Sequence, residues 1–189
     1  MIRGAVYDAC VLFPATLRDL MLRLAAADLV QPRWSDRILD ECFRNILLKR
    51  PELSVEALAR TRMKMCAAFP DAMVTDDVPV GSVFGLPDPD DVHVVEAAIR
   101  ADAASIITFN LRDFPERVLE PFRIGAIHPD DLVLAMLDEA PGRVCSVVEG
   151  QALALKKPTT TLTDLVDRIR NQGLPRSAAR LTDLFGSSS

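Results

Sequence analysis

The segment DPDDVHVVEAAIRADAASIITF, residues 88–109, decides the fold because it joins a helix to a buried strand. Asp88 fits a helix N-cap and Pro89 the first helical position, so we predict a helix from here to Ala101. The run SIITF at 105–109 is short and apolar and therefore predicts a buried strand. A helix that leads into a buried strand is the repeating unit of an α/β fold.

The same alternation extends in both directions from this segment. Short apolar strands are predicted at residues 5–7, 72–74 and 122–127, and helices at 14–27, 36–49, 54–69 and 129–139. Residues 31–33, with Pro32 in the middle, are predicted to form a turn. Strands that alternate with helices give a parallel sheet with helices on both faces, so the fold class is α/β.

Beyond residue 140 the pattern changes to helices only, predicted at 144–156, 162–171 and 177–184. This segment is too short to hold much core of its own. We therefore expect one α/β domain over residues 1–140 and a C-terminal helical extension, residues 141–189, that packs on it or beside it.

The composition excludes several classes of protein. With 49% hydrophobic residues, 26% charged residues and a net charge of −5, the chain is typical of globular proteins and has no strong nucleic-acid signature. No apolar run reaches the ~20 residues of a membrane span, and the N-terminus lacks a secretory signal, so we expect a cytoplasmic protein without a membrane partner. The four cysteines are widely separated, and the two histidines, His93 and His128, lie far apart. A metal would therefore rest on oxygen ligands.

Acidic side chains are predicted to gather at one edge of the sheet. Asp8 ends the first strand, and Asp113 follows the strand that closes the 88–109 segment. Ligands of open α/β sheets bind at such strand ends. Asp91 leads the buried stripe of the intervening helix, whereas Asp88 caps this helix and Asp90 faces solvent.

A fourth acid comes from the helix at 36–49, which follows the N-cap Ser35. Asp40 and Glu41 lie off its apolar stripe by similar angles, so periodicity does not choose between them. Three or four carboxylates at one strand edge repel one another unless a cation neutralises them, and oxygen ligands alone indicate Mg²⁺ or Mn²⁺. Such an ion activates water and stabilises a leaving oxygen, which suits phosphodiester hydrolysis.

These residues resemble the motifs of the PIN-domain family. VYDACVL at 6–12 is similar to the family's opening strand, in which the aspartate, here Asp8, is a metal ligand. SDRILDE at 35–41 resembles the second motif, a helix whose glutamate lies six residues after a serine, and this resemblance selects Glu41 over Asp40.

The last two motifs are the more specific ones. DPDD at 88–91 is similar to the third motif, in which the last aspartate, here Asp91, is catalytic. ITFNLRDFP at 107–115 resembles the fourth motif, with Asp113 as the final acid. Its polar support would come from Asn110 and Thr108.

The resemblance implies a three-layer α/β/α sandwich around a four- or five-stranded, mainly parallel sheet. It implies a metal-dependent endoribonuclease, commonly the toxin of a bacterial toxin–antitoxin pair, often dimeric and neutralised by a small antitoxin protein. The catalytic and metal-binding residues would be Asp8, Glu41, Asp91 and Asp113, with Asn110, Thr108 and Asp88 in support and Mg²⁺ or Mn²⁺ as cofactor. Ala9 and Cys10 depart from the family, because many members have a hydroxyl residue and an asparagine there.

Two other functions stay open at this point. An aspartyl-phosphatase would also use an aspartate at the end of the first strand, but it needs a second aspartate where Cys10 stands. A PIN-like fold with a decayed metal site would be an RNA- or protein-binding module, and the altered Ala9-Cys10 pair is the feature that favours it.

Four further expectations concern single side chains and one helix face. We expect His93 to be a partly exposed helix residue without a catalytic part, and Trp34 to be a packing anchor. Basic residues near the second motif, such as Arg37 and Arg44, are expected to be mostly solvated, although they could contact RNA phosphates. The leucine-rich stretch at 17–24 is a candidate surface for an antitoxin.

Overall fold

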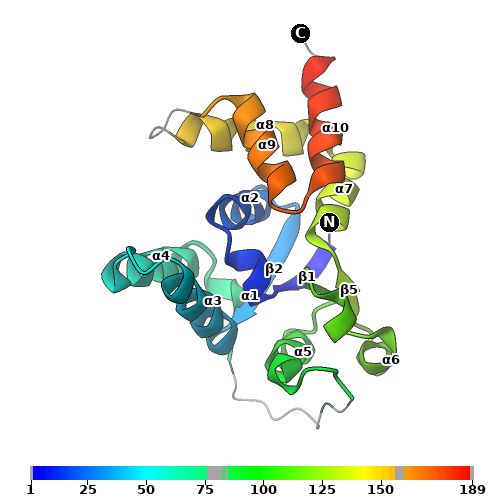
Figure 1. The fold of residues 1–189 in the computed structure, drawn as a ribbon. Coiled ribbons are helices and arrows are strands. Elements are labelled where there is room, and N and C mark those ends of the chain that lie inside the picture. The colour runs from blue at the N-terminus through cyan, green and yellow to red at the C-terminus, as the bar shows by residue number, and fades with distance from the viewer. Residues whose placement is uncertain (1, 76–82, 84, 156–159, 188–189) are drawn as a thin grey trace. The chain divides into compact units, whose positions relative to one another are not determined.

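The computed structural model describes residues 2–75, 83, 85–155 and 160–187 (Figure 1). The chain divides into two compact units. Unit 1 comprises Met1–Phe13 and Val30–Ile127, and unit 2 comprises Pro14–Leu29 and His128–Ser189. This division differs from the predicted one at residue 140. Within the described ranges, no helix is long and apolar enough to cross a membrane.

Unit 1 is built on a five-stranded sheet in which all neighbouring strands run parallel. The strand order is β3-β2-β1-β4-β5, with β1 (Ile2–Tyr7), β2 (Val30–Ser35), β3 (Met73–Val74), β4 (Ser105–Ile107) and β5 (Gly125–Ile127). The central strand β1 is buried from Ala5 to Tyr7. Because the strands are parallel, their carboxyl ends meet at one edge of the sheet, which is where ligands of such sheets bind.

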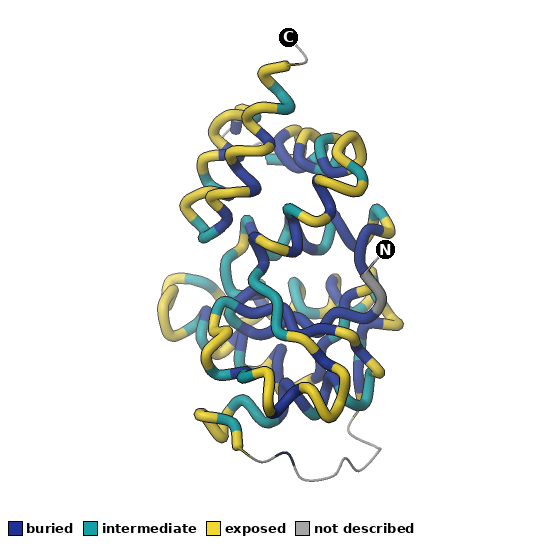
Figure 2. The backbone as a smooth tube through the Cα atoms, turned by 90° about the vertical axis from the view of Figure 1, so that its right-hand side faces the viewer, coloured by how far each residue is buried: buried dark blue, intermediate teal, exposed yellow. Residues whose placement is uncertain are grey.

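The helices of unit 1 cover this sheet. They are α1 (Ala9–Leu12), α3 (Asp36–Lys49), α4 (Val55–Ala68), α5 (Val92–Arg100) and α6 (Glu116–Leu119), with 3-10 turns η1 (Pro70–Ala72), η2 (Pro89–Asp91), η3 (Leu111–Asp113) and η4 (Glu120–Phe122). Helix α5 contacts β1, β2 and β4, and α3 contacts β2 and α5. The buried positions, dark blue in Figure 2, follow the strands and the inner faces of the helices. The predicted α/β class with a parallel sheet is confirmed.

Strand β2 corrects the turn that was predicted at residues 31–33. Pro32 suggested a turn because proline cannot donate a hydrogen bond to a neighbouring strand. The two-residue strand β3 pairs only with Trp34 and Ser35, so at Pro32 the strand has a paired neighbour on one side alone, β1. Trp34 is fully buried and meets the Phe69 ring edge to face, with 6.1 Å between the ring centroids, so the predicted packing anchor is confirmed.

Unit 2 is helical. It consists of α2 (Ala15–Ala26), α7 (Pro129–Glu139), α8 (Pro141–Ala154), α9 (Leu162–Asn171) and α10 (Pro175–Gly186). Helix α2 packs on α8 and α9, and α7 packs on α8 and α10. These contacts explain why α2 and α7 belong with the C-terminal helices. The candidate antitoxin surface at 17–24 is corrected by burial, because Leu17, Leu20, Met21 and Leu24 are buried and Leu22 is half-buried.

A buried carboxylate joins two helices of unit 2. Asp130, near the start of α7, accepts hydrogen bonds from the backbone N–H groups of Arg176 and Ser177 at 3.0 and 2.8 Å, and from Ser177 Oγ at 2.6 Å. The first turn of a helix has N–H groups without partners inside the helix, and an anion is favourable there. Asp130 therefore caps α10 from a distant part of the chain.

Candidate functional site

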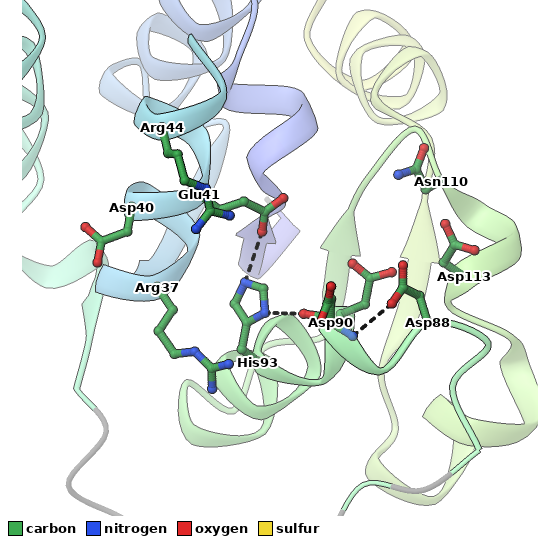
Figure 3. A pocket seen from close by; sticks show the side chains of 10 residues that line it. Arg37, Asp40, Glu41, Arg44, Asp88, Asp90, His93, Asn110 and Asp113 are labelled. Atoms are coloured by element: carbon green, nitrogen blue, oxygen red, sulfur yellow. Dashed lines mark hydrogen bonds and ion pairs between the residues drawn. The ribbon is translucent and has the colours of Figure 1, made fainter. Parts of the chain in front are cut away.

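An acidic cavity of about 590 Å³ lies in unit 1. Its walls come from α3, η2, the start of α5, and the loop and turn that follow β4. The lining residues, drawn in Figure 3, are Arg37, Asp40, Glu41, Arg44, Asp88, Asp90, Asp91, His93, Asn110 and Asp113. Three of the four predicted catalytic acids are among them, and Asp8 is the exception.

Asp8 lies at the carboxyl end of β1 and is 4% exposed. Its Oδ2 accepts a hydrogen bond of 2.7 Å from Thr108 Oγ1 and one of 3.1 Å from Cys10 Sγ. The Asn110 backbone N–H in turn donates to Thr108 Oγ1 at 3.0 Å. Thr108 therefore lies where polar support was expected, and it fixes one oxygen of Asp8.

The Cys10 thiol is a second hydrogen-bond donor to Asp8. Burial, followed by the charge of Asp8, raises the pKa of this thiol to about 12, so the sulfur keeps its proton at neutral pH. Its Sγ also accepts a hydrogen bond from the Phe109 backbone N–H at 3.4 Å. Cys10, which departs from the family's first motif, thus contacts Asp8, the acid of that motif.

Asp91 lies at the junction of η2 and α5 and is half-buried. Its pKa is raised to about 7 by burial first, and then by the charges of Asp8, Asp88, Asp113 and Glu41. The other three predicted catalytic acids and Asp88 therefore all lie close enough to Asp91 for their charges to raise its pKa. Asp88, in turn, accepts a hydrogen bond from the Asp90 backbone N–H at 2.9 Å and caps η2.

Asp40 and Glu41, which periodicity could not separate, have different partners. The Asp40 carboxylate forms an ion pair with Arg62 of α4, which also contacts Asp36 at 2.7 Å. Glu41 instead faces His93, and its Oε2 lies 3.4 Å from His93 Nε2 (Figure 3). Glu41 is therefore the acid of α3 that reaches toward α5.

His93 corrects the expectation of a partly exposed helix residue, because it is only 7% exposed. Its Nδ1 lies 2.6 Å from the Asp90 carbonyl oxygen and its Nε2 faces Glu41. Burial by itself lowers the pKa of His93, but Glu41 and the Asp90 carbonyl outweigh it, so the pKa is raised overall. A signal was present in the sequence: His93 is two residues from Asp91, on the helix that carries the third motif.

The remaining predicted residues follow β4. Asn110 and Asp113 both line the cavity, and the backbone N–H of Asp113 donates to the Asn110 carbonyl at 2.9 Å in the turn η3. Asn110 is exposed and Asp113 is half-buried. The turn thus presents a carboxylate to the cavity at the same sheet edge as Asp8.

Two arginines stand beside the acids. Arg37 and Arg44 lie one turn before and one turn after Glu41 on α3, and both line the cavity (Figure 3). Arg37 is 3.9 Å from Glu96, a long contact between an exposed guanidinium and a half-buried carboxylate. Among the described residues no ion pair to Arg44 is formed. The i, i+4, i+7 spacing of residues 37, 41 and 44 is the sequence signal for this shared face.

The acids do not form a closed metal cluster. In the described part of the chain, no three acidic, histidine or cysteine side chains come together tightly enough to coordinate one ion. The donor set nevertheless fits a hard divalent cation, because the acids are oxygen donors and their repulsion already raises the pKa of Asp91. A bound cation would relieve that repulsion.

The raised pKa of Asp91 predicts a pH-dependent effect on stability. A carboxyl whose pKa is higher in the folded protein stabilises the fold fully only below its unfolded value, near 4, and this contribution is lost as the pH rises through about 7. In EDTA, Asp91→Asn should therefore unfold at a higher temperature than the wild type at pH 8, by an amount that corresponds to about 1–2 kcal/mol once solvent screening is included.

The difference in melting temperature should shrink as the pH falls below about 7 and approach zero below about pH 4, where Asp91 is neutral in both the folded and the unfolded protein. Asp90→Asn, one residue away and exposed, serves as the control and should show little difference at either pH. An Asp91→Asn protein that melts below the wild type at pH 8 would contradict the assignment.

Comparison with known proteins shows which families the sequence matches. Residues 4–112 match the PIN domain family, and residues 129–183 match the VapC50 C-terminal domain. Over 99 residues the chain is 39% identical to a protein of Mycobacterium tuberculosis (strain ATCC 25618 / H37Rv) named "Putative ribonuclease VapC50", an alignment that covers 52% of this chain and 58% of that protein. The chain thus matches only a little over half the length of this relative. No solved structure matches the chain.

The PIN domain match covers more than half of the chain and includes Asp8, Glu41 and Asp91; Asp113 comes directly after its last residue. The parallel sheet and the acids at its carboxyl edge agree with that match. The chain belongs to the PIN domain family.

Proposed function

We propose that this protein is a metal-dependent endoribonuclease that hydrolyses RNA phosphodiester bonds. The observation that carries the proposal is the convergence of acids on Asp91, whose pKa is raised to about 7 by burial and by the surrounding carboxylates. Catalytic sites are where such perturbed groups concentrate. The name of the Mycobacterium relative supports RNA as the substrate.

The residues that would hold Mg²⁺ or Mn²⁺ are Asp8, Glu41, Asp91 and Asp113. A divalent cation bound there would supply an activated water and charge stabilisation for the leaving oxygen. The protein's own contribution is to hold its ligands: Thr108 and Cys10 fix one oxygen of Asp8, and His93 faces Glu41. Ligand carboxylates held in this way need less reorganisation when the ion binds.

Arg37 and Arg44 are suited to the RNA backbone. Both line the cavity and lie one turn before and one turn after Glu41, so a phosphate bound beside Glu41 would have two guanidinium groups near it. Arginine matches phosphate geometry through paired N–H donors. These two residues would thus offset the repulsion between the acidic cavity and a polyanion.

Arg44→Gln should raise KM for a single-stranded RNA about three- to tenfold while kcat changes little, because one phosphate contact is lost from the bound state. The salt dependence of KM should become weaker in the same variant. Arg60→Gln, on the exposed face of α4, is the matched control. Equal KM values for the Arg44 variant and the wild type would show that Arg44 does not contact the bound RNA.

The role of a toxin that is neutralised by a small antitoxin rests on the resemblance to PIN-domain toxins. The matched C-terminal segment, residues 129–183, belongs to unit 2 and extends the likeness to a VapC50 protein beyond the PIN domain. The stretch 17–24 offers little apolar surface to an antitoxin, because Leu17, Leu20 and Leu24 are buried and Leu22 is half-buried. Co-purification of a small protein encoded beside this gene would support the pairing; a homodimer stays a prediction.

Cleavage of total cellular RNA tests the proposed function. Wild-type protein should cut RNA with Mg²⁺ or Mn²⁺ and stop in EDTA, and Asp8→Asn should not cut RNA with either ion. Cleavage by the variant that equals the wild type would exclude Asp8 from the site. A wild type that binds RNA and no Mn²⁺ would instead indicate a binding module.

A further inference from the structure

A second cavity, of about 470 Å³, lies between α3 and α4 in unit 1. The side chains that line it are Asp40, Phe43, Arg44, Leu47, Leu48 and Arg62. Phe43 is buried, Leu47 is half-buried and Leu48 is 74% exposed. The apolar surface of this cavity therefore extends from the protein interior to solvent, and a ligand can reach it.

The second cavity borders the acidic one, because Asp40 and Arg44 line both. Arg44 lies one turn after Glu41 and one turn before Leu48 on α3, and residues at this spacing share a helix face. The order along the face is an acid, a guanidinium and an apolar side chain. Glu41 and Leu48 are two turns apart, about 10 Å along the helix axis, which is a distance that one nucleotide can bridge.

A guanidinium group is fixed beside the apolar side chains. Arg62 of α4 contacts Asp36 at 2.7 Å and forms a second ion pair with Asp40. These two carboxylates hold the Arg62 side chain at the wall of the cavity. Guanidinium planes are among the surfaces on which the bases of single-stranded RNA stack.

The size of the cavity distinguishes between possible occupants. A stable protein–protein interface buries about 800 Å² on each partner and involves about 20–30 residues a side, whereas six described residues line this cavity. Its volume is instead within the range of about 300–1,000 Å³ that is typical of small-molecule pockets. A nucleotide fits both parts of the surface, because its base has apolar faces for the leucines and its phosphate is attracted to Arg44.

We propose that the cavity between α3 and α4 binds one base of a single-stranded RNA, next to the phosphate that Arg44 contacts. The proposal rests on the proposed function, from which it takes RNA as the ligand, and it adds a site that receives a base. The bases of double-stranded RNA are stacked inside the helix, whereas loops, bulges and ends can present an unstacked base. The cavity therefore selects single-stranded segments of RNA.

The test compares a short single-stranded RNA of mixed sequence with its abasic counterpart, which keeps the sugar–phosphate chain. Fluorescence anisotropy in EDTA, where no cleavage is expected, measures the Kd of each. The wild type should bind the RNA at least about fivefold more tightly than the abasic chain, because stacking of the base is lost from the latter. Leu48→Ser should lose most of this difference. It should keep the salt dependence of the wild type, which Arg44→Gln reduces.

Leu153→Ser is the matched control, because Leu153 is 79% exposed on α8 and should not affect either Kd. Equal binding of the two chains to the wild type, or binding of neither, would overturn the base site. Unchanged discrimination in Leu48→Ser would also overturn it. A Leu48→Ser protein that discriminates normally but converts a dimer into a monomer would assign the cavity to a contact between copies of the chain. Cleavage of total RNA tests the nuclease separately, because none of these binding measurements requires hydrolysis.

Discussion

Asp91→Asn is expected to lower the rate of RNA cleavage at least about 10³-fold, because it removes the acid on which the charges of the other four carboxylates converge. The amide has nearly the same shape, so the loss comes from the missing charge and not from packing. In the metal-free protein the same substitution should stabilise the fold at pH 8. A variant that is inactive and yet more stable than the wild type would show that the loss of activity is not caused by unfolding.

Asp90→Asn is the matched control for this experiment. The Asp90 side chain is exposed, and the contact of this residue to His93 uses its backbone carbonyl, which the substitution retains. The control should cleave RNA within about threefold of the wild type, in line with other surface substitutions. Single-turnover cleavage of a labelled RNA measures both rates. Similar losses in the two variants would mean that general acidity of the loop, and not Asp91, supports the reaction.

Glu41→Gln is expected to have the second largest effect, a loss of about 10²-fold or more in kcat. Glu41 reaches from α3 toward α5, and its Oε2 lies 3.4 Å from His93 Nε2. Loss of the charge should weaken Mn²⁺ binding, so a higher Mn²⁺ concentration should restore part of the rate.

Asp40→Asn tests the residue next to Glu41, which carries the same charge and lies on the same helix. Asp40 pairs with Arg62 at the α3–α4 contact, and a partly exposed ion pair of this kind contributes less than about 1 kcal/mol. This variant should keep nearly full activity and melt slightly earlier than the wild type. If Asp40→Asn were inactive and Glu41→Gln active, Asp40 and not Glu41 would be the acid that α3 contributes to the site.

The parts of the fold that depend on local pattern could be predicted from the sequence. The helix that starts at Asp88-Pro89 and the strand after it are found in the structure, with the strand ending at Ile107. Strand β2 could not be predicted, because Pro32 normally breaks a sheet and is tolerated only where β3 is too short to reach it. The division between the units could not be predicted either, since it depends on which buried helix faces meet.

The candidate site shows the same limit. Strand ends and caps indicated Asp8, Asp88, Asp91 and Asp113, because their positions follow from local structure. Periodicity left Asp40 and Glu41 open, and only the resemblance to the family's second motif selected Glu41. The folded chain gives the two acids different partners, Arg62 for Asp40 and His93 for Glu41. His93 is buried on α5, which contacts α3, β1, β2 and β4, and no local pattern contains these contacts.

The most direct test of the central claim is RNA cleavage by EDTA-treated, dialysed wild-type protein as Mn²⁺ is added in steps. The acids around Asp91 are proposed to form a metal site that supports hydrolysis. Cleavage should therefore be absent without metal and should rise with the same midpoint as Mn²⁺ binding measured by calorimetry. Cleavage that persists in EDTA, or Mn²⁺ binding without any cleavage of total cellular RNA, would contradict it.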